Sequence, residues 1–326
     1  MKLCFVVHRY SPFPGGSEYY VQQMAEECVN RGHDVTVIAA EHNGDLNGVK
    51  VTNSGQRVFD RYDLMIVHGG DVSVQNQILM NAKTIPSPIL YLLIKPSESS
   101  VCLQALNDVK YIGCSTLEDW KHTEKWFVQE KSRKVTHGIS PKDCTGVKGV
   151  FKKKYNIPED KQMFLSCGGY WHNKKMIELA NTFQKANLKD AILVTTGYDN
   201  RSNLMPTASE IVFPLMIEDP QDVKNAIADA ECYIMNSDSE GFGLVILEAM
   251  LNKTPWISRD IAGASLLRDY GNTYTTESQL INILQNLHTN SSDNYLVIES
   301  AYQCVTQNYL IKNTVDDILD VANEKD

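Results

Sequence analysis

Long apolar runs are missing from this sequence. No continuous apolar run in its 326 residues approaches the ~18–20 residues that a membrane-spanning helix needs. The first run, Leu3–Val7, stops at His8 and Arg9, so it is too short for a signal-peptide core, and no small-residue cleavage site follows it. Glycine (19) and proline (11) are too scarce for a collagen-like chain. These absences predict a globular protein, which we expect in the cytoplasm, with no transmembrane segment.

Paired cysteines are also missing. The eight cysteines contain no CxxC pair, and Cys4, Cys167 and Cys232 lie inside apolar runs. A disulfide framework or a zinc site needs a closer and more regular spacing. We therefore expect reduced, buried thiols and no bound metal.

Positive charge is scarce over most of the chain. The formal charge is −9 and the pI is about 5.4, which argues against an obligate binder of nucleic acid or of an anionic membrane. The charge is uneven, because residues 121–154 carry +7, whereas the residues before them carry −4 and those after them −12. Two interpretations stay open for this basic segment. It is either a solvated linker or a patch that faces a phosphate-bearing or anionic acceptor.

Short apolar runs alternate with helical stretches along the chain. The runs are continuous rather than alternating, as in strands buried on both faces of a parallel sheet. Repeated βα units imply parallel sheets with right-handed crossovers. We expect strands at Leu3–His8, Val35–Ala39, Leu64–His68, Ile89–Ile94, Tyr111–Cys114, Met163–Cys167, Ala191–Thr196, Ile211–Phe213, Cys232–Met235 and Thr254–Ser258, and helices at Glu18–Arg31, Val72–Lys83, Lys175–Ala186, Gln221–Ala228, Leu244–Leu251 and Glu277–Leu287.

The pattern restarts once. Residues 140–160 contain no strand signal, and a new strand begins at Met163. This predicts two doubly wound domains, residues 1–148 and 149–326, which face each other across a cleft. The final helical stretch, Tyr295–Ala322, is a candidate for packing back on the first domain. In such sheets, ligands bind at the carboxyl ends of the strands, near helix N-termini.

Two loops after predicted strands have unusual composition. The first, SPFPGGSEYY, places Gly15 and Gly16 at the start of a helix, where bare backbone N–H groups can approach an anion. An ordinary strand–helix turn explains this loop equally well. The second, NSDSEGFGLVILEAM, spans residues 236–250 and leads from a strand into a helix near Gly243. Its unhindered backbone and the positive end of the new helix suit a diphosphate.

The second loop also carries two carboxylates. Glu240 precedes the helix and Glu248 follows eight residues later, about 12 Å away if that spacing were wholly helical. Groups that far apart do not make an acid–base pair, but they can hold hydroxyls at the two ends of an elongated ligand.

The segment EGFGLVILEAMLNKTPWIS resembles the Glu-x7-Glu signature of family 4 glycosyltransferases, which are retaining nucleotide-sugar enzymes of the GT-B fold. The match covers Glu240, Gly241, Phe242, Gly243, Leu247, Glu248, Ala249, Met250 and Pro255. Other segments agree in order and spacing: Gly15-Gly16-Ser17-Glu18 with the family's GGxE loop, His137-Gly138-Ile139 with its hG(I/V) element, Lys174 with its KGxxxLIxAF, and Gly197 with its LxxxG. The resemblance covers roughly residues 1–260.

The resemblance implies a role for each matching residue. It places Glu248 on the donor ribose, Lys174 on the diphosphate and Glu240 on the sugar hydroxyls. Asp238-Ser239-Glu240 looks like a metal-binding DxD motif, but the family that the chain resembles is typically metal-independent, so the resemblance implies no metal here. The implied donor-binding set is Gly15, Gly16, Lys174, Lys175, Gly197, Glu240, Gly241, Phe242, Gly243, Leu244 and Glu248.

The chain departs from the family pattern at several positions. No arginine follows the first strand of the second domain, where the segment reads CGGYWHNKK, so Lys174, Lys175 and His172 are the available cations. Lys95 stands where the family has a histidine, and His68, at the end of the preceding strand, is the nearest alternative. Asn252-Lys253 replaces the family's small residue plus Gly, and Ala264-Ser265 replaces its Pro-Glu.

The resemblance implies a retaining, metal-independent hexosyl- or pentosyltransferase. Its co-substrate is a UDP- or GDP-linked sugar, and no cofactor is expected. The predicted catalytic residues are Glu240, Lys174 and His68, and the candidate cleft residues are His8, Lys95, His137 and His172. The acceptor stays open among glycans, lipids, proteins, small metabolites and modified nucleic acid, and peripheral membrane contact stays open with it. Two other functions remain: a sugar-nucleotide epimerase or hydrolase, and a non-catalytic binding protein.

Overall fold

The computed structural model describes residues 1–13, 15–53, 55–68, 73–93, 100–197, 212–215, 217, 219–289 and 295–324. The chain divides into two compact units. The first contains Met1–Ser140 and Tyr309–Asp326, and the second contains Pro141–Asn308. Each unit is built on its own sheet, and they are described in turn.

The first unit contains a seven-stranded sheet in the order β3-β2-β1-β4-β5-β6-β7. All of its strand pairings are parallel, and the order reverses between β1 and β4. The strands are β1 (Lys2–Arg9), β2 (Asp34–Glu41), β3 (Lys50–Thr52), β4 (Leu64–His68), β5 (Ile89–Leu92), β6 (Tyr111–Cys114) and β7 (Ser132–Lys134).

Helices pack against this sheet, and alternate residues along a strand point toward the same helices. Cys4 and Val6 of β1 pack in one buried cluster with Leu79 and Leu106, which come from two different helices. The last helix of the chain lies beside the first helix, where Arg31 Nη1 donates to Asp316 Oδ1 at 2.6 Å. The helices of this unit are α1 (Gly16–Asn30), α2 (Ser73–Met80), α3 (Ser100–Asp108), α4 (Leu117–Lys125) and α12 (Ile311–Asn323).

The second unit contains a six-stranded parallel sheet in the order β10-β9-β8-β11-β12-β13. This order repeats that of the first six strands of the other sheet, with the reversal between β8 and β11. The strands are β8 (Gln162–Cys167), β9 (Ala191–Thr196), β10 (Val212–Leu215), β11 (Cys232–Met235), β12 (Trp256–Arg259) and β13 (Asn272–Tyr274).

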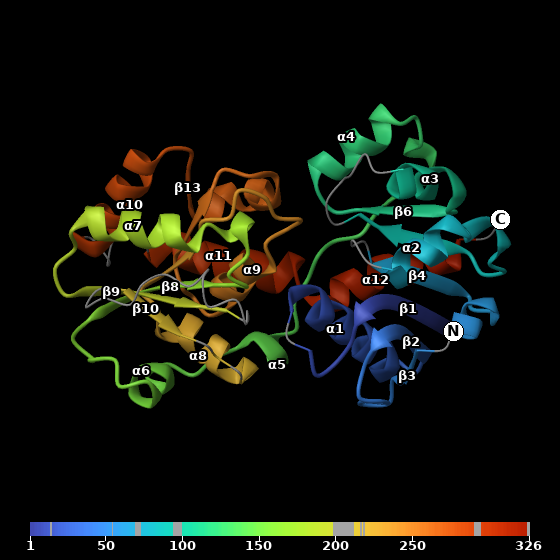
Figure 1. Cartoon of the computed structure of the whole chain (residues 1–326), viewed down its shortest axis with the longest axis horizontal. Coiled ribbons are helices and arrows are strands. Elements are labelled where there is room, and N and C mark those ends of the chain that lie inside the picture. The colour runs from blue at the N-terminus through green and yellow to red at the C-terminus, as the bar shows by residue number, and fades with distance from the viewer. Residues whose placement is uncertain are drawn as a thin grey trace. The chain divides into compact units, whose positions relative to one another are not determined.

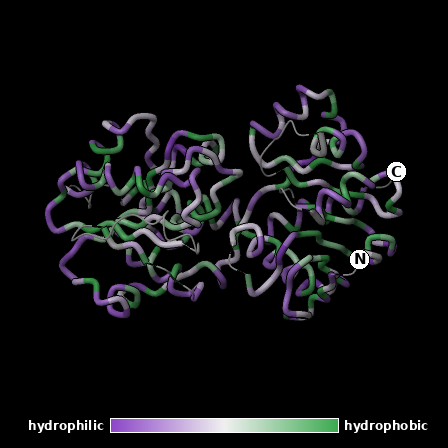
Figure 2. Tube along the Cα trace, in the orientation of Figure 1, coloured by the Kyte–Doolittle hydropathy of each residue, from purple (hydrophilic) through white to green (hydrophobic). Residues whose placement is uncertain are grey.

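In this unit, α7 and α10 cover one face of the sheet and α8 lies on the other (Figure 1). The strands are mostly hydrophobic, whereas the outer turns are mostly hydrophilic (Figure 2). Phe164 and Leu193 of the sheet pack in one buried core with Phe183 of α7 and Leu284 of α10. The helices are α5 (Pro141–Cys144), α6 (Val150–Lys154), α7 (Met176–Ala186), α8 (Pro220–Asp229), α9 (Leu244–Leu251), α10 (Glu277–Thr289) and α11 (Tyr295–Asn308).

Two doubly wound parallel sheets were the class predicted from the sequence, and this is confirmed. The strands that the pattern missed, β3, β7 and β13, have three residues each, which is too short for a periodic signal. The predicted stretch Tyr295–Ala322 is two helices, α11 and α12, and the division between the units falls between them, at Asn308 and Tyr309.

The predicted boundary at residues 148/149 differs from the division that the structure shows. Residues 141–148 belong to the second unit because their backbone is bonded to it. Gly146 N donates to Asn252 Oδ1 at 2.8 Å, and Val147 N donates to Asn225 Oδ1 at 2.9 Å. Asn252 is one of the departures from the family pattern, and this contact gives it a structural role.

The basic segment 121–154 divides between the two units. In the first unit, Arg133 forms a bidentate ion pair with Glu324. In the second, Lys154 Nζ lies 2.5 Å from Asp222 Oδ2, and Lys152 Nζ donates to the Lys161 carbonyl. Part of the +7 charge is therefore paired within each unit, which favours the linker interpretation over a patch that faces an anionic acceptor.

The cysteines and the helices agree with two further expectations. The seven cysteines whose side chains are described are all buried, free thiols: Cys4, Cys28, Cys114, Cys144, Cys167, Cys232 and Cys304. None of the helices in the described ranges combines the length and the apolar character that crossing a membrane requires.

Candidate functional site

The strongest candidate site lies where the strand order of the second sheet reverses. The carboxyl ends of β8 and β11 are neighbours there, so the loops that follow them start side by side. This is the position at which doubly wound sheets bind ligands. Residues 168–175 are called the β8 loop below, and residues 236–243 the β11 loop. Together they contain six of the eleven residues of the implied donor-binding set: Lys174, Lys175, Glu240, Gly241, Phe242 and Gly243.

Hydrogen bonds and ion pairs join these two loops. Asp238 N donates to the Asn173 carbonyl at 3.0 Å, and Asn173 Nδ2 donates to the Ser239 carbonyl at 3.4 Å. Lys174 Nζ lies 2.5 Å from Glu240 Oε1, and both side chains are largely shielded from solvent, at 23% and 17% exposed. The structure therefore brings together the two residues predicted to meet the diphosphate and the sugar.

The neighbouring cations have different surroundings. Lys175 Nζ lies 3.4 Å from Asp238 Oδ2, and the Lys175 backbone is left-handed, with φ 52°. His172 is exposed in the short 3-10 turn His172–Lys174. Asp238 and Glu240 are thus each paired with a lysine. Among the described residues, no group of three His, Cys, Asp or Glu side chains is arranged to hold a metal ion.

The backbone geometry explains why two positions of the site are glycine. A Cβ on Gly197, at the end of β9, would lie 1.6 Å from the Gly168 carbonyl oxygen, so only glycine lets β9 approach the β8 loop this closely. Gly243 has φ +80° and stands directly before α9. Glycine is the residue that adopts this conformation without strain. Gly241 and Leu244 are partly buried beside it, and Phe242 is buried.

Glu248 lies on the second turn of α9 and is partly buried. Burial raises the pKa of its carboxyl group to about 7, although Lys224 partly opposes the shift. The negative charge of Glu248 also affects Cys167 at the end of β8. Burial raises the pKa of the Cys167 thiol, and the Glu248 charge raises it further. None of the described residues forms a hydrogen bond or ion pair with the Glu248 carboxylate. Because the side chain is only partly buried, water can still reach the carboxylate, and hydrogen bonds from a ligand could replace that water.

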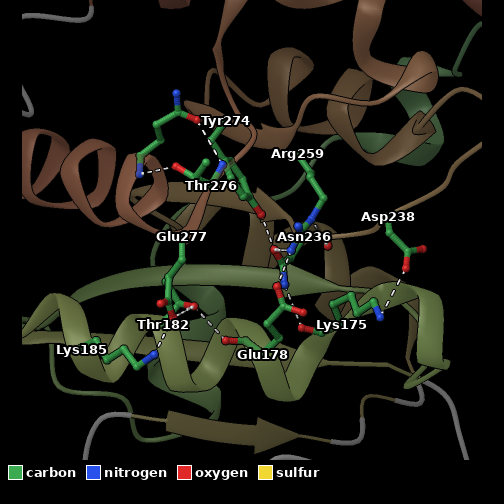
Figure 3. A network of polar contacts seen from close by, with 11 residues as sticks. Lys175, Glu178, Thr182, Lys185, Asn236, Asp238, Arg259, Tyr274, Thr276 and Glu277 are labelled. Carbon is green, nitrogen blue, oxygen red and sulfur yellow. Dashed lines mark hydrogen bonds and ion pairs between the residues drawn. The ribbon is translucent and has the colours of Figure 1, made fainter.

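The sequence reasoning missed three residues of this region: Asn236, Arg259 and Tyr274. Asn236 Oδ1 accepts from Arg259 Nη2 at 3.0 Å and from the Tyr274 hydroxyl (Figure 3). Arg259 ends β12, so an arginine is present near the site although none follows β8. No local motif marks these residues. Only their positions at the carboxyl ends of adjacent strands would have identified them.

The first unit has a comparable reversal, between β1 and β4. His8, near the end of β1, places Nε2 3.7 Å from Glu41 Oε1. Gly15 precedes α1, and the Glu18 carboxylate lies over it, where a Cβ on Gly15 would meet Glu18 Oε2 at 2.1 Å. Gly16 begins α1 with open space around its Cα. Pro14 and Lys95 lie outside the described residues.

His68, at the end of β4, is buried in an aromatic cluster. The Tyr20 ring contacts both histidines of the cluster, with centroid distances of 5.7 Å to His68 and 5.0 Å to His137. The Tyr20 hydroxyl is 3.2 Å from His137 Nδ1. Burial, assisted by His68, lowers the pKa of His137 to about 3, so His137 is neutral at physiological pH. Tyr20 is a further residue that the sequence reasoning missed.

Part of the second unit is similar to a family of known proteins. Residues 147–279 match the family model described as "Glycosyl transferases group 1". A 143-residue segment is 26% identical to the O-antigen biosynthesis glycosyltransferase WclY of Escherichia coli. That alignment covers 42% of this chain and 40% of the relative, so the chain matches well under half of WclY.

Solved structures resemble the whole chain. The sucrose-phosphate synthase of Thermosynechococcus elongatus superposes with a TM-score of 0.80 over 98% of both chains, at 14% identity. HepE of Anabaena, solved in complex with UDP-glucose, superposes with a TM-score of 0.79 over 98% of this chain and 99% of HepE, at 16% identity. Likeness at this identity shows the fold, and the fold is the predicted GT-B class.

Proposed function

We propose that this chain is a retaining glycosyltransferase of family 4 that moves a hexosyl or pentosyl group from a nucleotide-diphosphate sugar to an acceptor. The observation that carries the proposal is the contact between Lys174 and Glu240 at the strand reversal of the second sheet. The match of residues 147–279 to group 1 glycosyltransferases and the GT-B fold support it.

Glu248 is the proposed ribose ligand. Its carboxylate is partly buried on the second turn of α9 and accepts no hydrogen bond from a described residue, so it is available to two ribose hydroxyls. A hydrogen bond to a charged group contributes about 1.5–3 kcal/mol. UDP or GDP is the proposed nucleotide, and UDP is favoured because HepE was solved with UDP-glucose.

Lys174 and the start of α9 are the proposed diphosphate site. The backbone of Gly241–Gly243 leads into α9, whose N-terminus carries partial positive charge. Lys174 would exchange its contact with Glu240 for the phosphate next to the sugar. Glu240 would then accept hydrogen bonds from the sugar hydroxyls and fix the sugar's orientation.

The proposed reaction breaks the bond between the sugar C1 and the phosphate oxygen. The bonding electrons stay on the phosphate, where Lys174 and the α9 N-terminus stabilise the growing charge. The acceptor hydroxyl oxygen bonds to C1 on the same face, so the configuration is retained, and its proton passes to the departing phosphate. No protein nucleophile takes part in this step.

We propose that the transfer needs no divalent metal, because Asp238 and Glu240 are each paired with a lysine. Lys174 would supply the cation that a metal provides elsewhere. Turnover should therefore survive a chelator such as EDTA. Loss of turnover with EDTA and its return with Mg²⁺ or Mn²⁺ would contradict this part of the proposal.

The first unit is the proposed acceptor side. His68, held against Tyr20 and close to His137, is its proposed catalytic group. The acceptor class stays open among glycans, lipids, proteins, small metabolites and modified nucleic acid.

A nucleotide screen tests the proposal. Melting temperatures would be measured with UDP, GDP, ADP and CMP, since a ligand that binds only the folded state raises stability. We expect UDP or GDP to raise the melting temperature of the wild type and to have a much smaller effect on Glu248→Gln. The corresponding sugar nucleotides would then be tested for turnover with a panel of acceptors. Consumption of donor with water alone would indicate a hydrolase, and no response to any nucleotide would exclude the proposal.

A further inference from the structure

Asn236, the first residue of the β11 loop, bonds this loop to the β8 loop and to the end of β12. It directly follows β11, and its side chain is 2% exposed. Asn236 Nδ2 donates to the Lys175 carbonyl at 2.8 Å, while Oδ1 accepts from Arg259 Nη2 at 3.0 Å and from the Tyr274 hydroxyl. Figure 3 shows Asn236 between Arg259 and Lys175.

The chemistry of the partners determines which way the Asn236 amide points. A guanidinium group only donates, so it must face the amide oxygen, and a backbone carbonyl only accepts, so it must face the NH₂ group. Arg259 is itself held, because Nη2 donates to Glu178 Oε1 at 2.6 Å and Nε donates to the Asn236 carbonyl at 3.3 Å. Arg259 therefore orients the amide of Asn236 toward Lys175.

Lys175 is a position where such support matters. Its φ of 52° and ψ of 37° are left-handed, a conformation that residues with a side chain rarely adopt. Its carbonyl also accepts the first helical hydrogen bond of α7, from Leu179 N at 3.0 Å. Lys174 immediately precedes this turn, so the direction of the Lys174 side chain depends on the conformation of Lys175.

We propose that Asn236 is a positioning residue of the donor site: by holding the Lys175 carbonyl it stabilises the left-handed turn that directs Lys174 toward Glu240 and the donor phosphate. Arg259 supports the turn through its hydrogen bonds to Asn236. This inference rests on the proposed function only for the identity of the ligand. The geometry of the turn is independent of it.

Two variants separate this role from general stability. Asn236→Asp has the same shape and keeps the bonds from Arg259 and Tyr274, but it presents an oxygen to the Lys175 carbonyl and cannot donate to it. Lys175→Gly adopts the left-handed conformation freely and does not need that bond. Asn225→Asp is the matched control, because it places the same charge at another buried asparagine of the second unit.

The nucleotide arm compares UDP with UMP by calorimetry, because only UDP carries the second phosphate. We expect Asn236→Asp to lower the ratio of UDP affinity to UMP affinity by about tenfold. This is the loss expected when the charged hydrogen bond from Lys174 to the second phosphate is weakened. UMP affinity should not change, and Asn225→Asp should leave the ratio at its wild-type value. In the Lys175→Gly background, Asn236→Asp should change the ratio by less than about twofold. Equal losses in both backgrounds would overturn the inference.

The ligand-free arm measures hydrogen exchange of the Asp238 amide, which donates to Asn173 across the two loops. Asn236→Asp should accelerate this exchange at least severalfold, and adding Lys175→Gly should reverse most of that change. Unchanged exchange in Asn236→Asp would overturn the inference whether or not nucleotide binds. If the wild type binds neither UDP nor GDP, the proposed function fails, and the exchange result alone still decides whether Asn236 positions the turn.

Discussion

Lys174 and Glu240 form a contact of 2.5 Å across two loops whose strands are neighbours in the sheet. In the proposed reaction these two residues have separate partners, since the cation meets the phosphate and the carboxylate meets sugar hydroxyls. In the ligand-free protein each is the other's partner. Donor binding would therefore exchange one ion pair for two ligand contacts, which keeps both charges satisfied before and after binding.

The role of Lys174 predicts a larger effect on the reaction than on binding. Lys174→Ala should lower turnover by about 100-fold or more, because the phosphate charge grows in the transition state, and should weaken UDP binding by only about tenfold. Steady-state kinetics and calorimetry measure the two effects. Lys175→Ala is the control, and a severe loss in that variant with an active Lys174→Ala would assign the phosphate contact to Lys175.

The raised pKa of the partly buried Glu248 carboxylate predicts opposite effects on stability and binding. Its pKa is about 7 in the folded protein but near 4.5 when unfolded, so the folded state holds this proton more tightly. The ligand-free protein should therefore lose stability as the pH rises from about 4.5 to 7. At pH 8, Glu248→Gln should be about 1–3 kcal/mol more stable than the wild type, and this gain should shrink by pH 5.

The same variant should bind UDP more weakly at pH 8, since it has no carboxylate for the ribose. Wild-type affinity for UDP should fall as the pH drops below about 7, where Glu248 becomes protonated, and Glu248→Gln should show a flatter profile. Denaturation and calorimetry across pH 5–8 measure both effects. A variant that binds UDP as tightly as the wild type at pH 8 would remove Glu248 from the ribose.

The close approach at Gly197 predicts a steric loss. Gly197→Ala would place a Cβ 1.6 Å from the Gly168 carbonyl oxygen, and the backbone must move to relieve this. We expect a cost of about 2–4 kcal/mol in the free energy of unfolding, together with weaker UDP binding. Gly16→Ala is the matched control, because the space around Gly16 is open. Comparable stability of the two variants in denaturant titrations would contradict this account.

The neutral His137 predicts acid sensitivity. Its pKa is lowered to about 3 by burial and by His68, whereas an unfolded histidine titrates near 6.5. The unfolded state binds the proton first, so this residue should cost stability as the pH falls from about 6.5 toward 4. His137→Gln should reduce that pH dependence. If the slope of unfolding free energy against pH is the same in His137→Gln and in the wild type, the pKa of His137 does not differ between the folded and the unfolded protein.

The basic segment predicts local rather than acceptor-related effects. Lys154→Gln should lower the melting temperature, because it leaves the buried Asp222 carboxylate without its ion pair. Lys153→Gln removes the same charge from an exposed neighbouring position and should leave stability nearly unchanged. Once an acceptor is known, both variants should retain its affinity and its salt dependence. A common loss of affinity at low salt would instead support an anionic acceptor.

Part of the site was predictable because its residues are close together in the sequence. Glu240, Gly243 and Glu248 lie within one strand–loop–helix segment, so their spacing and the bare backbone already indicated a phosphate-binding helix start. Lys174 required the resemblance to place it near Glu240, since 66 residues separate the two. Its contact with Glu240 follows from β8 and β11 being neighbours, which the order of strands along the chain does not reveal.

The sequence alone determined that the chain forms two parallel, doubly wound sheets, because continuous apolar runs between amphipathic stretches bury strands on both faces. It also determined which loop leads into α9. The tertiary structure decided which side chains meet: Asn236 with Arg259 across 23 residues, and Tyr20 with His137 across 117. The periodicity of apolar residues along the sequence predicts whether a residue is buried. Its polar partners depend on strand order and register, which only the folded chain specifies.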